Sequence, residues 1–177
     1  MISKKYTKDY RVEARLTKHG RVRDEAVYCG EHFRFARPQE DVRRSFRYLA
    51  AAELGMALLT IVPMCFPCAY CKQMYIVLPL VLSLIPVYLL LTALNRVRTA
   101  GETVIREHRD KIANRFPAGA LLQLILQGLV LAAGVVFVFI GELNAIDWVF
   151  TALAVLRAAL SVLIFLHRRD FAMEPAE

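Results

Sequence analysis

Residues 48–93 read YLAAAELGMALLTIVPMCFPCAYCKQMYIVLPLVLSLIPVYLLLTA, two apolar runs joined by the short corner CFPCAYC at residues 65–71. Each run is about long enough to cross the ~30 Å hydrocarbon core of a bilayer, because a helix rises about 1.5 Å per residue. Two more apolar runs follow, at 117–140 and 145–167. The sequence therefore predicts an all-α integral membrane protein built as a four-helix transmembrane bundle.

The composition fits this architecture. Of the 177 residues, 57% are hydrophobic, yet the formal net charge is +7, and a soluble domain rarely combines the two. The charges are concentrated in residues 1–47, between the second and third apolar runs, and at the end of the chain. No cleavable signal peptide is expected, because the N-terminus is polar and the first apolar run starts near residue 47.

The distribution of Lys and Arg predicts the orientation. Residues 1–47 carry thirteen, residues 96–118 carry six and the tail after Leu166 carries two, whereas the corner 65–73 carries one and the turn 141–147 none. Positive residues stay on the cytoplasmic side, so we expect an N-in/C-in protein with both short corners outside. From its small size we expect the bacterial inner membrane. Three aromatic side chains are expected at the outer interface: Tyr70, Tyr75 and Trp148.

Residues 1–37 are predicted to form a small cytoplasmic β-meander. From Tyr10 to Leu16, apolar and polar residues alternate with the period of a half-buried strand. Residues 18–20 are typical of a turn, and further strands are expected at 21–28 and 33–35. About thirty residues are too few to fold alone, so the meander is expected to pack on the membrane surface, a cytoplasmic loop or a second subunit.

Prolines and capping residues set the expected helix boundaries. Pro38 is expected in the first turn of its helix, Pro79 and Pro86 are expected to kink theirs, and Asn144 with Asp147 forms a predicted N-cap pair. The predicted segments are transmembrane helix 1 with a cytoplasmic lead-in at 38–66, transmembrane helix 2 at 73–95, a cytoplasmic amphipathic helix at 102–116, transmembrane helix 3 at 117–140, transmembrane helix 4 at 145–167 and a cytoplasmic tail at 168–177. The last residues of this tail, 172–177, are expected to be frayed.

The basic cytoplasmic face points to lipid as a partner. Its cations are interspersed with acids and lie next to the membrane, so anionic phospholipid headgroups are expected there and nucleic acid is not. The helix at 102–116 is compatible with three places: on the headgroups, against the meander, or in solvent as a salt-bridged linker.

Three cysteines form two overlapping C-x-x-C pairs at the outer corner: Cys65, Cys68 and Cys71. Where Pro67-Cys68-x-x-Cys71 opens the second helix of an N-in/C-in bundle, the chain resembles the quinone-linked disulfide bond formation protein B family in topology. The resemblance implies quinone as a cofactor and these cysteines as redox groups. That family carries a second cysteine pair in its other outer loop, whereas residues 141–147 contain no cysteine.

Other roles for these cysteines compete with redox catalysis. They can form a structural disulfide or remain buried thiols, and an odd cysteine can bridge to a second subunit. No metal is expected, because zinc needs four Cys or His ligands and the histidines all lie on the predicted cytoplasmic side: His19, His32, His108 and His167.

Four polar residues fall inside the predicted spans: Glu53, Gln123, Gln127 and Arg157. A charge in hydrocarbon costs about 3 kcal/mol or more, so these groups should face one another or water. We expect a Glu53–Arg157 ion pair, with the two residues about one helical turn apart in depth and with Gln123 or Gln127 as support. This buried polar cluster serves either as an interhelical clamp or as a site for an ion, a proton or an anionic ligand.

Small residues recur on the predicted membrane helices and allow close helix approach, so a homodimer or a larger membrane complex is expected. The positions are Ala50, Ala51, Ala52, Gly55, Gly128, Ala132, Gly134, Ala154, Ala158 and Ala159. Motifs for phosphate binding, nucleotide binding and nucleophilic catalysis are missing. The leading expectation is therefore a non-catalytic scaffold or accessory subunit. The alternatives are a homo-oligomeric channel or small-ion carrier that uses the polar cluster, and a thiol-disulfide oxidoreductase at the corner.

Overall fold

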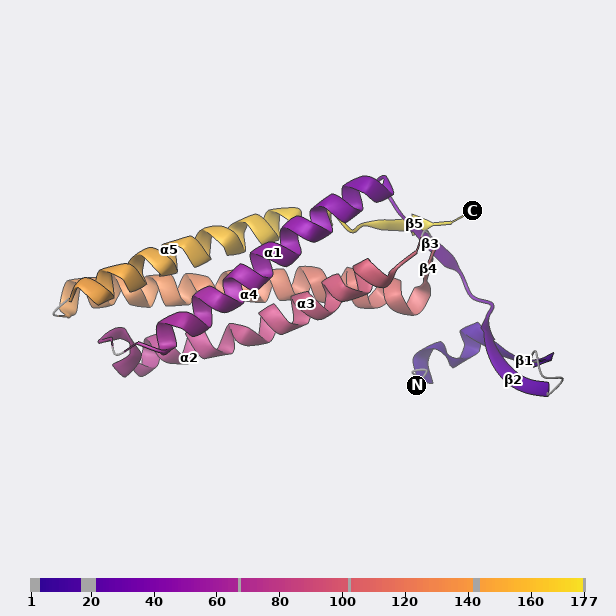
Figure 1. Ribbon diagram of the computed structural model, residues 1–177, viewed down its shortest axis with the longest axis horizontal. Helices are drawn as coiled ribbons and strands as arrows, with labels where there is room; N and C mark the ends of the chain where they lie inside the picture. The colour runs from indigo at the N-terminus through magenta and orange to yellow at the C-terminus, as the bar shows by residue number, and fades with distance from the viewer. Residues whose placement is uncertain (1–3, 17–21, 67, 102, 142–143, 177) are drawn as a thin grey trace.

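The computed structural model describes residues 4–16, 22–66, 68–101, 103–141 and 144–176. It contains four helical segments long and apolar enough to cross a membrane: Gln39–Met64, Met74–Thr99, Arg106–Ile140 and Ala145–Arg169. The prediction of a helical bundle with four candidate membrane spans is confirmed. The helices lie lengthwise beside one another, and α1 (Gln39–Met64) runs obliquely across the others (Figure 1).

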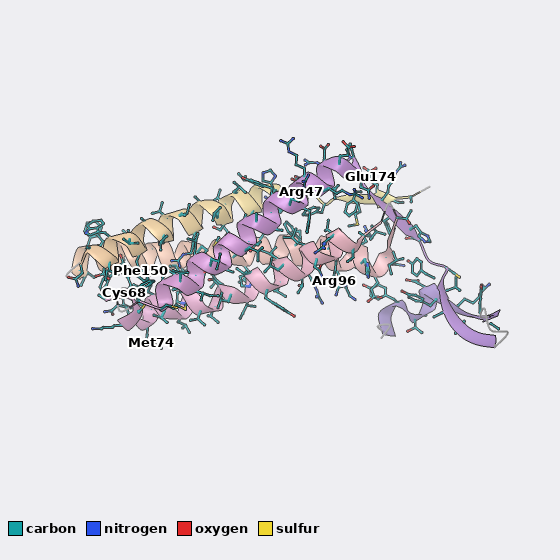
Figure 2. All side chains as sticks on the ribbon, viewed as in Figure 1. Arg47, Cys68, Met74, Arg96, Phe150 and Glu174 are labelled. Carbon is teal, nitrogen blue, oxygen red and sulfur yellow. The ribbon has the colours of Figure 1, made fainter. Side chains whose placement is uncertain are left out.

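The bundle has two different ends, and we name them by what lies there. The corner end holds residues 65–73 and the start of α5 (Ala145–Leu166), and the sheet end holds a small three-stranded sheet. Figure 2 labels Cys68 and Phe150 at the corner end and Arg47 and Glu174 toward the sheet end.

The first candidate span begins one residue later and ends two residues earlier than the predicted segment at 38–66. α1 begins directly after Pro38, with the acids Glu40 and Asp41 in its first turn, and it ends one residue after Pro63. Acids at this position interact favourably with the positive end of the helix dipole. Pro38 itself precedes the helix and does not lie in its first turn.

The second span is broken in the middle. It consists of α2 (Met74–Leu82) and α3 (Leu84–Thr99), separated at Ser83. Pro86 has no N–H group to donate to the carbonyl of Leu82, which accounts for a break at this point. The helix continues past Pro79. α3 extends four residues beyond the predicted end at 95, because Arg96 and Arg98 suit the negative end of a helix.

The predicted division at Pro117 is wrong. Residues 106–140 form one helix, α4 (Arg106–Ile140), in place of an amphipathic helix at 102–116 and a separate span at 117–140. A proline inside a helix removes one hydrogen bond, and here packing compensates for it. Ile112, Phe116 and Ala120 lie on one side of α4 and enter the same apolar core on both sides of Pro117.

The predicted three-stranded meander is also wrong. β1 (Tyr10–Leu16) and β2 (Val22–Tyr28) form an antiparallel hairpin whose expected turn, at 18–20, lies outside the described residues. β3 (His32–Phe35) leaves this hairpin and pairs with β4 (Val104–Ile105) and β5 (Met173–Pro175) in the order β4-β3-β5. This pairing buries Phe33 and Val104 at the sheet end, and periodicity within the first 37 residues cannot reveal such distant partners.

The residues that were expected to be frayed, 172–177, instead join this sheet as far as the structure describes them. β5 pairs with β3, and Phe171 is buried edge-on against Phe116, with ring centres 5.2 Å apart. Asp170 is buried as well. Its carboxylate accepts a hydrogen bond from Ser45 Oγ over 3.0 Å and forms an ion pair with Arg37 Nη1 at 2.8 Å. The end of the chain is therefore joined to the lead-in of α1.

Candidate functional site

The polar cluster is buried, as the sequence predicts for groups that avoid hydrocarbon. Glu53 on α1, Gln123 and Gln127 on α4, and Arg157 on α5 are each at most 2% exposed. On α4, Gln123 and Gln127 are four residues apart and therefore lie on one face of the helix. Three helices thus direct polar side chains into the interior of the bundle.

Glu53 and Arg157 do not form the predicted ion pair, although both belong to the described part of the chain. Gln123 Nε2 donates to Glu53 Oε2 over 3.4 Å, while Arg157 Nη1 donates to the backbone carbonyl of Leu59 over 3.1 Å. Leu59 follows Glu53 by six residues, about 9 Å along α1 toward the corner end. The difference in depth is therefore larger than the single turn that we expected, and long side chains do not close it.

The cluster leaves five buried polar atoms without a hydrogen-bond partner. They are Glu53 Oε1, Gln123 Oε1, Gln127 Oε1, Gln127 Nε2 and Arg157 Nε. Each buried polar atom without a partner costs about 1–3 kcal/mol, and more where the group is charged. Such a concentration of unsatisfied donors and acceptors is characteristic of a site that takes up water or a ligand.

A small cavity reaches one end of the cluster. It measures about 20 Å³, and among the residues that line it are Tyr70, Cys71, Leu80, Val130 and Arg157. A water molecule needs a cavity of at least about 10–15 Å³, so this one has room for a single water beside the guanidinium group. The cavity lies between the corner residues and Arg157.

Sequence reasoning did not single out three further buried hydroxyl groups, Thr60, Ser83 and Ser161. Each donates within its own part of the chain, to the carbonyls of Met56, Leu80 and Ala158 respectively. These bonds satisfy the hydroxyl protons, so the hydroxyl oxygens are available only as acceptors. Serine and threonine are common in helix interfaces, which is why composition alone gives no signal for them.

At the corner, two of the three predicted cysteines come together. The sulfur atoms of Cys68 and Cys71 are 2.9 Å apart, while Cys65 is exposed and directs its sulfur toward the Ile61 carbonyl. The peptide N–H of Cys71 donates to the sulfur of Cys68 over 3.3 Å. The fourth cysteine, Cys29, lies in the N-terminal region and is also exposed.

Asp147 fixes this corner to the start of α5. One carboxylate oxygen accepts the peptide N–H of Ala69 over 3.1 Å, and the other accepts the peptide N–H of Asn144 over 3.0 Å. The contact with Asn144 confirms the predicted capping interaction, whereas the contact with Ala69 joins residues 78 positions apart and has no local sequence signal.

Tyr70 holds the corner from the other side. It is buried within the protein, whereas Tyr75 and Trp148, the other two aromatic residues expected at the outer interface, are exposed. Its hydroxyl lies 2.7 Å from Thr151 Oγ1, and its ring packs against Phe137 with ring centres 4.7 Å apart.

The surroundings of Cys71 disfavour its thiolate. Burial raises the pKa of Cys71 to about 12, with further contributions from the neighbouring Cys68 sulfur and from the Asp147 carboxylate. Cys71 is therefore a protonated thiol at neutral pH. The pair has the spacing of a dithiol that can lose two electrons and two protons to form a disulfide.

Within the residues described, no group of three or more His, Cys, Asp and Glu side chains is placed to hold a metal ion. Comparison with protein-family models, with curated proteins and with solved structures finds no match to this chain.

Proposed function

We propose that the protein is a small membrane carrier or channel for a proton or a small ion, and that the polar cluster is its binding site. The observation that carries this proposal is the set of five unpartnered polar atoms on four buried side chains. The proposed setting is a bacterial inner membrane, with both termini cytoplasmic as the distribution of positive residues predicts.

In a bilayer the cluster lies where no bulk water is available. A charge at the centre of a span costs about 3 kcal/mol or more, and such residues are rare outside ion pathways, proton relays and ligand sites. Glu53 and Arg157 do not neutralise each other, since each has a different partner. A proton, an ion or water at the cluster would supply the missing contacts.

The broken second span also supports a transport role. Discontinuous membrane helices often form ion sites, because the break leaves backbone carbonyls free to coordinate. The break at Ser83 is one turn from Leu80, which lines the same small cavity as Arg157.

A non-catalytic scaffold or accessory subunit is the competing proposal. It rests on the lack of catalytic motifs, and it assigns the cluster to an interhelical clamp. A clamp is expected to satisfy its own polar atoms, as pairing lowers the cost of burial. We therefore favour the transport proposal. Under either proposal, the small residues that face outward suit a homodimer, because Gly55 and Gly128 have no neighbour within 4 Å of the position of a Cβ atom.

Flux through proteoliposomes tests the transport proposal. The full chain is reconstituted, a membrane potential is imposed, and proton uptake is followed with a trapped pH dye, with parallel assays for Na⁺, K⁺ and Cl⁻. At least one of these fluxes should exceed that of empty liposomes, and Glu53→Gln should abolish it. This variant preserves the size of the side chain and removes its ionisable carboxyl group.

Thr60→Val is the matched control. Thr60 is fully buried on the same helix, but its hydroxyl bonds to its own helix at Met56. This variant should retain the flux. Wild-type protein that passes none of the four ions, while folded and correctly reconstituted, would refute the transport proposal and favour the scaffold.

The geometry of the corner favours a second candidate function, the oxidation of two thiols to a disulfide by a quinone. The sulfurs of Cys68 and Cys71 are already in contact. In the proposed reaction the two thiols form a disulfide, and their two electrons and two protons reduce a quinone to a quinol. Quinone reduction by the purified, reduced protein should disappear in Cys68→Ser with Cys71→Ser and persist in Cys65→Ser. If the double variant reduces quinone at the wild-type rate, this candidate fails.

A further inference from the structure

A large cavity lies at the sheet end, away from the polar cluster. It has a volume of about 480 Å³ and lies between the first turns of α1 and the last turn of α3. This volume falls within the range of about 300–1,000 Å³ that is usual for small-ligand sites. We call it the arginine cavity, because three arginines line it: Arg43, Arg47 and Arg98.

These arginines come from two helices and face one space. Arg43 and Arg47 are four residues apart on α1, so they lie on one side of that helix, and Arg98 lies in the last turn of α3. Among the residues that the structure describes, no acidic side chain lines the cavity. The ion pairs among the described residues involve other cations, namely Arg37, Arg109, Lys111 and His167.

The remaining wall of the cavity is largely apolar. Val42 and Val97 are almost completely buried there, and Phe35 and Phe46 are partly buried beside them. A site with three guanidinium groups and an apolar wall fits a ligand that is anionic at one end and apolar at the other. Guanidinium groups bind phosphate with two parallel hydrogen bonds, which makes a phosphate group the fitting anion.

The position of the arginines along α1 favours a lipid over a soluble anion as the ligand. Leu54, exposed on the apolar face of α1, follows Arg47 by seven residues, about 10 Å along the helix. The headgroup layer of a bilayer is about 5–8 Å thick on each side of the hydrocarbon core. A phosphate at the arginines therefore places acyl chains beside the apolar surface of the helices.

We propose that the arginine cavity binds the headgroup of an anionic phospholipid. This inference requires that the chain spans a bilayer, and it is independent of the transport proposal. It assigns the expected lipid contact to the cleft between α1 and α3, whereas the sequence alone suggested the segment at 102–116 as a place for headgroups.

Native mass spectrometry tests the proposal. The purified full chain in detergent is equilibrated with equal amounts of phosphatidylglycerol and phosphatidylcholine that carry the same acyl chains, and the bound lipids are counted. The wild type should retain the anionic lipid at least about tenfold better. Each cation near an anionic headgroup contributes about fivefold in affinity, so replacing all three arginines by glutamine should remove most of this preference.

The matched control removes the same charge elsewhere. Arg44→Gln with Arg115→Gln and Arg169→Gln changes three exposed arginines that do not line the cavity, and it should preserve the lipid preference. If the variant with all three cavity arginines replaced does not fold, Arg47→Gln alone should lower the preference for the anionic lipid by about fivefold.

Three results would overturn the proposal. The first is a wild type that binds both lipids equally, which would leave an acidic protein partner as the better reading. The second is an equal loss of preference in the control variant, because the effect would then come from diffuse charge. The third is displacement of the lipid by inorganic phosphate at millimolar concentration, since this would assign the cavity to a soluble anion.

Discussion

Replacing Asp147 by alanine tests whether the cysteine corner depends on α5. The carboxylate is 1% exposed and accepts two peptide N–H groups, from Ala69 and Asn144. A hydrogen bond to a charged group contributes about 1.5–3 kcal/mol, and an N-cap contact about 0.5–1 kcal/mol. Asn144 is exposed, so its N–H group can turn to water and only the cap contribution is lost. The half-buried Ala69 N–H group has no such replacement, so the larger contribution of its hydrogen bond to the charged carboxylate is lost. The sum is a loss of about 2–4 kcal/mol.

The assay combines stability with the accessibility of one thiol. Under reducing conditions, Cys68 is buried and should react slowly with a maleimide. If the corner detaches locally, its rate should rise by about tenfold for each 1.4 kcal/mol lost, which predicts an increase of at least about 30-fold. Asp147→Asn retains one carbonyl oxygen as an acceptor and should give an intermediate rate. Mass spectrometry of the labelled peptides measures each cysteine separately.

Asp41→Ala is the control for this experiment. Asp41 is an exposed acid in the first turn of α1, and its loss should cost no more than about 1 kcal/mol and leave the rate of Cys68 unchanged. Equal rates of maleimide labelling of Cys68 in the wild type and in Asp147→Ala would contradict the prediction, because the corner would then be held without this carboxylate.

Three further predictions concern single positions. The pKa of Cys71 is raised to about 12 from an ordinary value of 9.0, so its rate of reaction with iodoacetamide should rise about tenfold for each pH unit up to about pH 12. The rate of an ordinary thiol levels off above pH 9, and a plateau near pH 9 for Cys71, measured by peptide mass spectrometry, would contradict this prediction. Gly119→Ala should be less stable than Gly128→Ala by about 1–3 kcal/mol in detergent unfolding. The reason is that a Cβ atom at position 119 would lie 3.1 Å from Leu90 Cγ, whereas one at position 128 would meet nothing within 4 Å. Equal stabilities of the two variants would rule out the close approach of Gly119 to Leu90. Asp170→Ala should release β5 and speed proteolysis of the C-terminal residues at least tenfold. The expected cost is about 2–4 kcal/mol, for the lost hydrogen bonds to the buried carboxylate and the lost pair with the half-exposed Arg37. Unchanged proteolysis would show that the sheet holds without this carboxylate.

The candidate site was predictable in its members but not in its contacts. Rare polar residues inside apolar runs are conspicuous, so Glu53 and Arg157 could be selected from the sequence alone. Which atoms meet depends on how far each helix slides along its neighbours. A difference in depth of more than one turn separates the two members of an ion pair, and neither residue carries information about the other helix. The same reasoning explains why Ala69 was not expected as a partner of Asp147.

Composition and periodicity along single segments predict the four apolar helices, the approximate limits of α1 and α5 and the identity of the buried polar residues. The folded structure was needed to show that Pro117 lies within a continuous helix, that β3 pairs with β4 and β5, that Cys68 rather than Cys65 lies against Cys71, and that Glu53 and Arg157 have separate partners. These outcomes depend on contacts between distant segments, and the free energy of such contacts is set by packing geometry that no local pattern encodes.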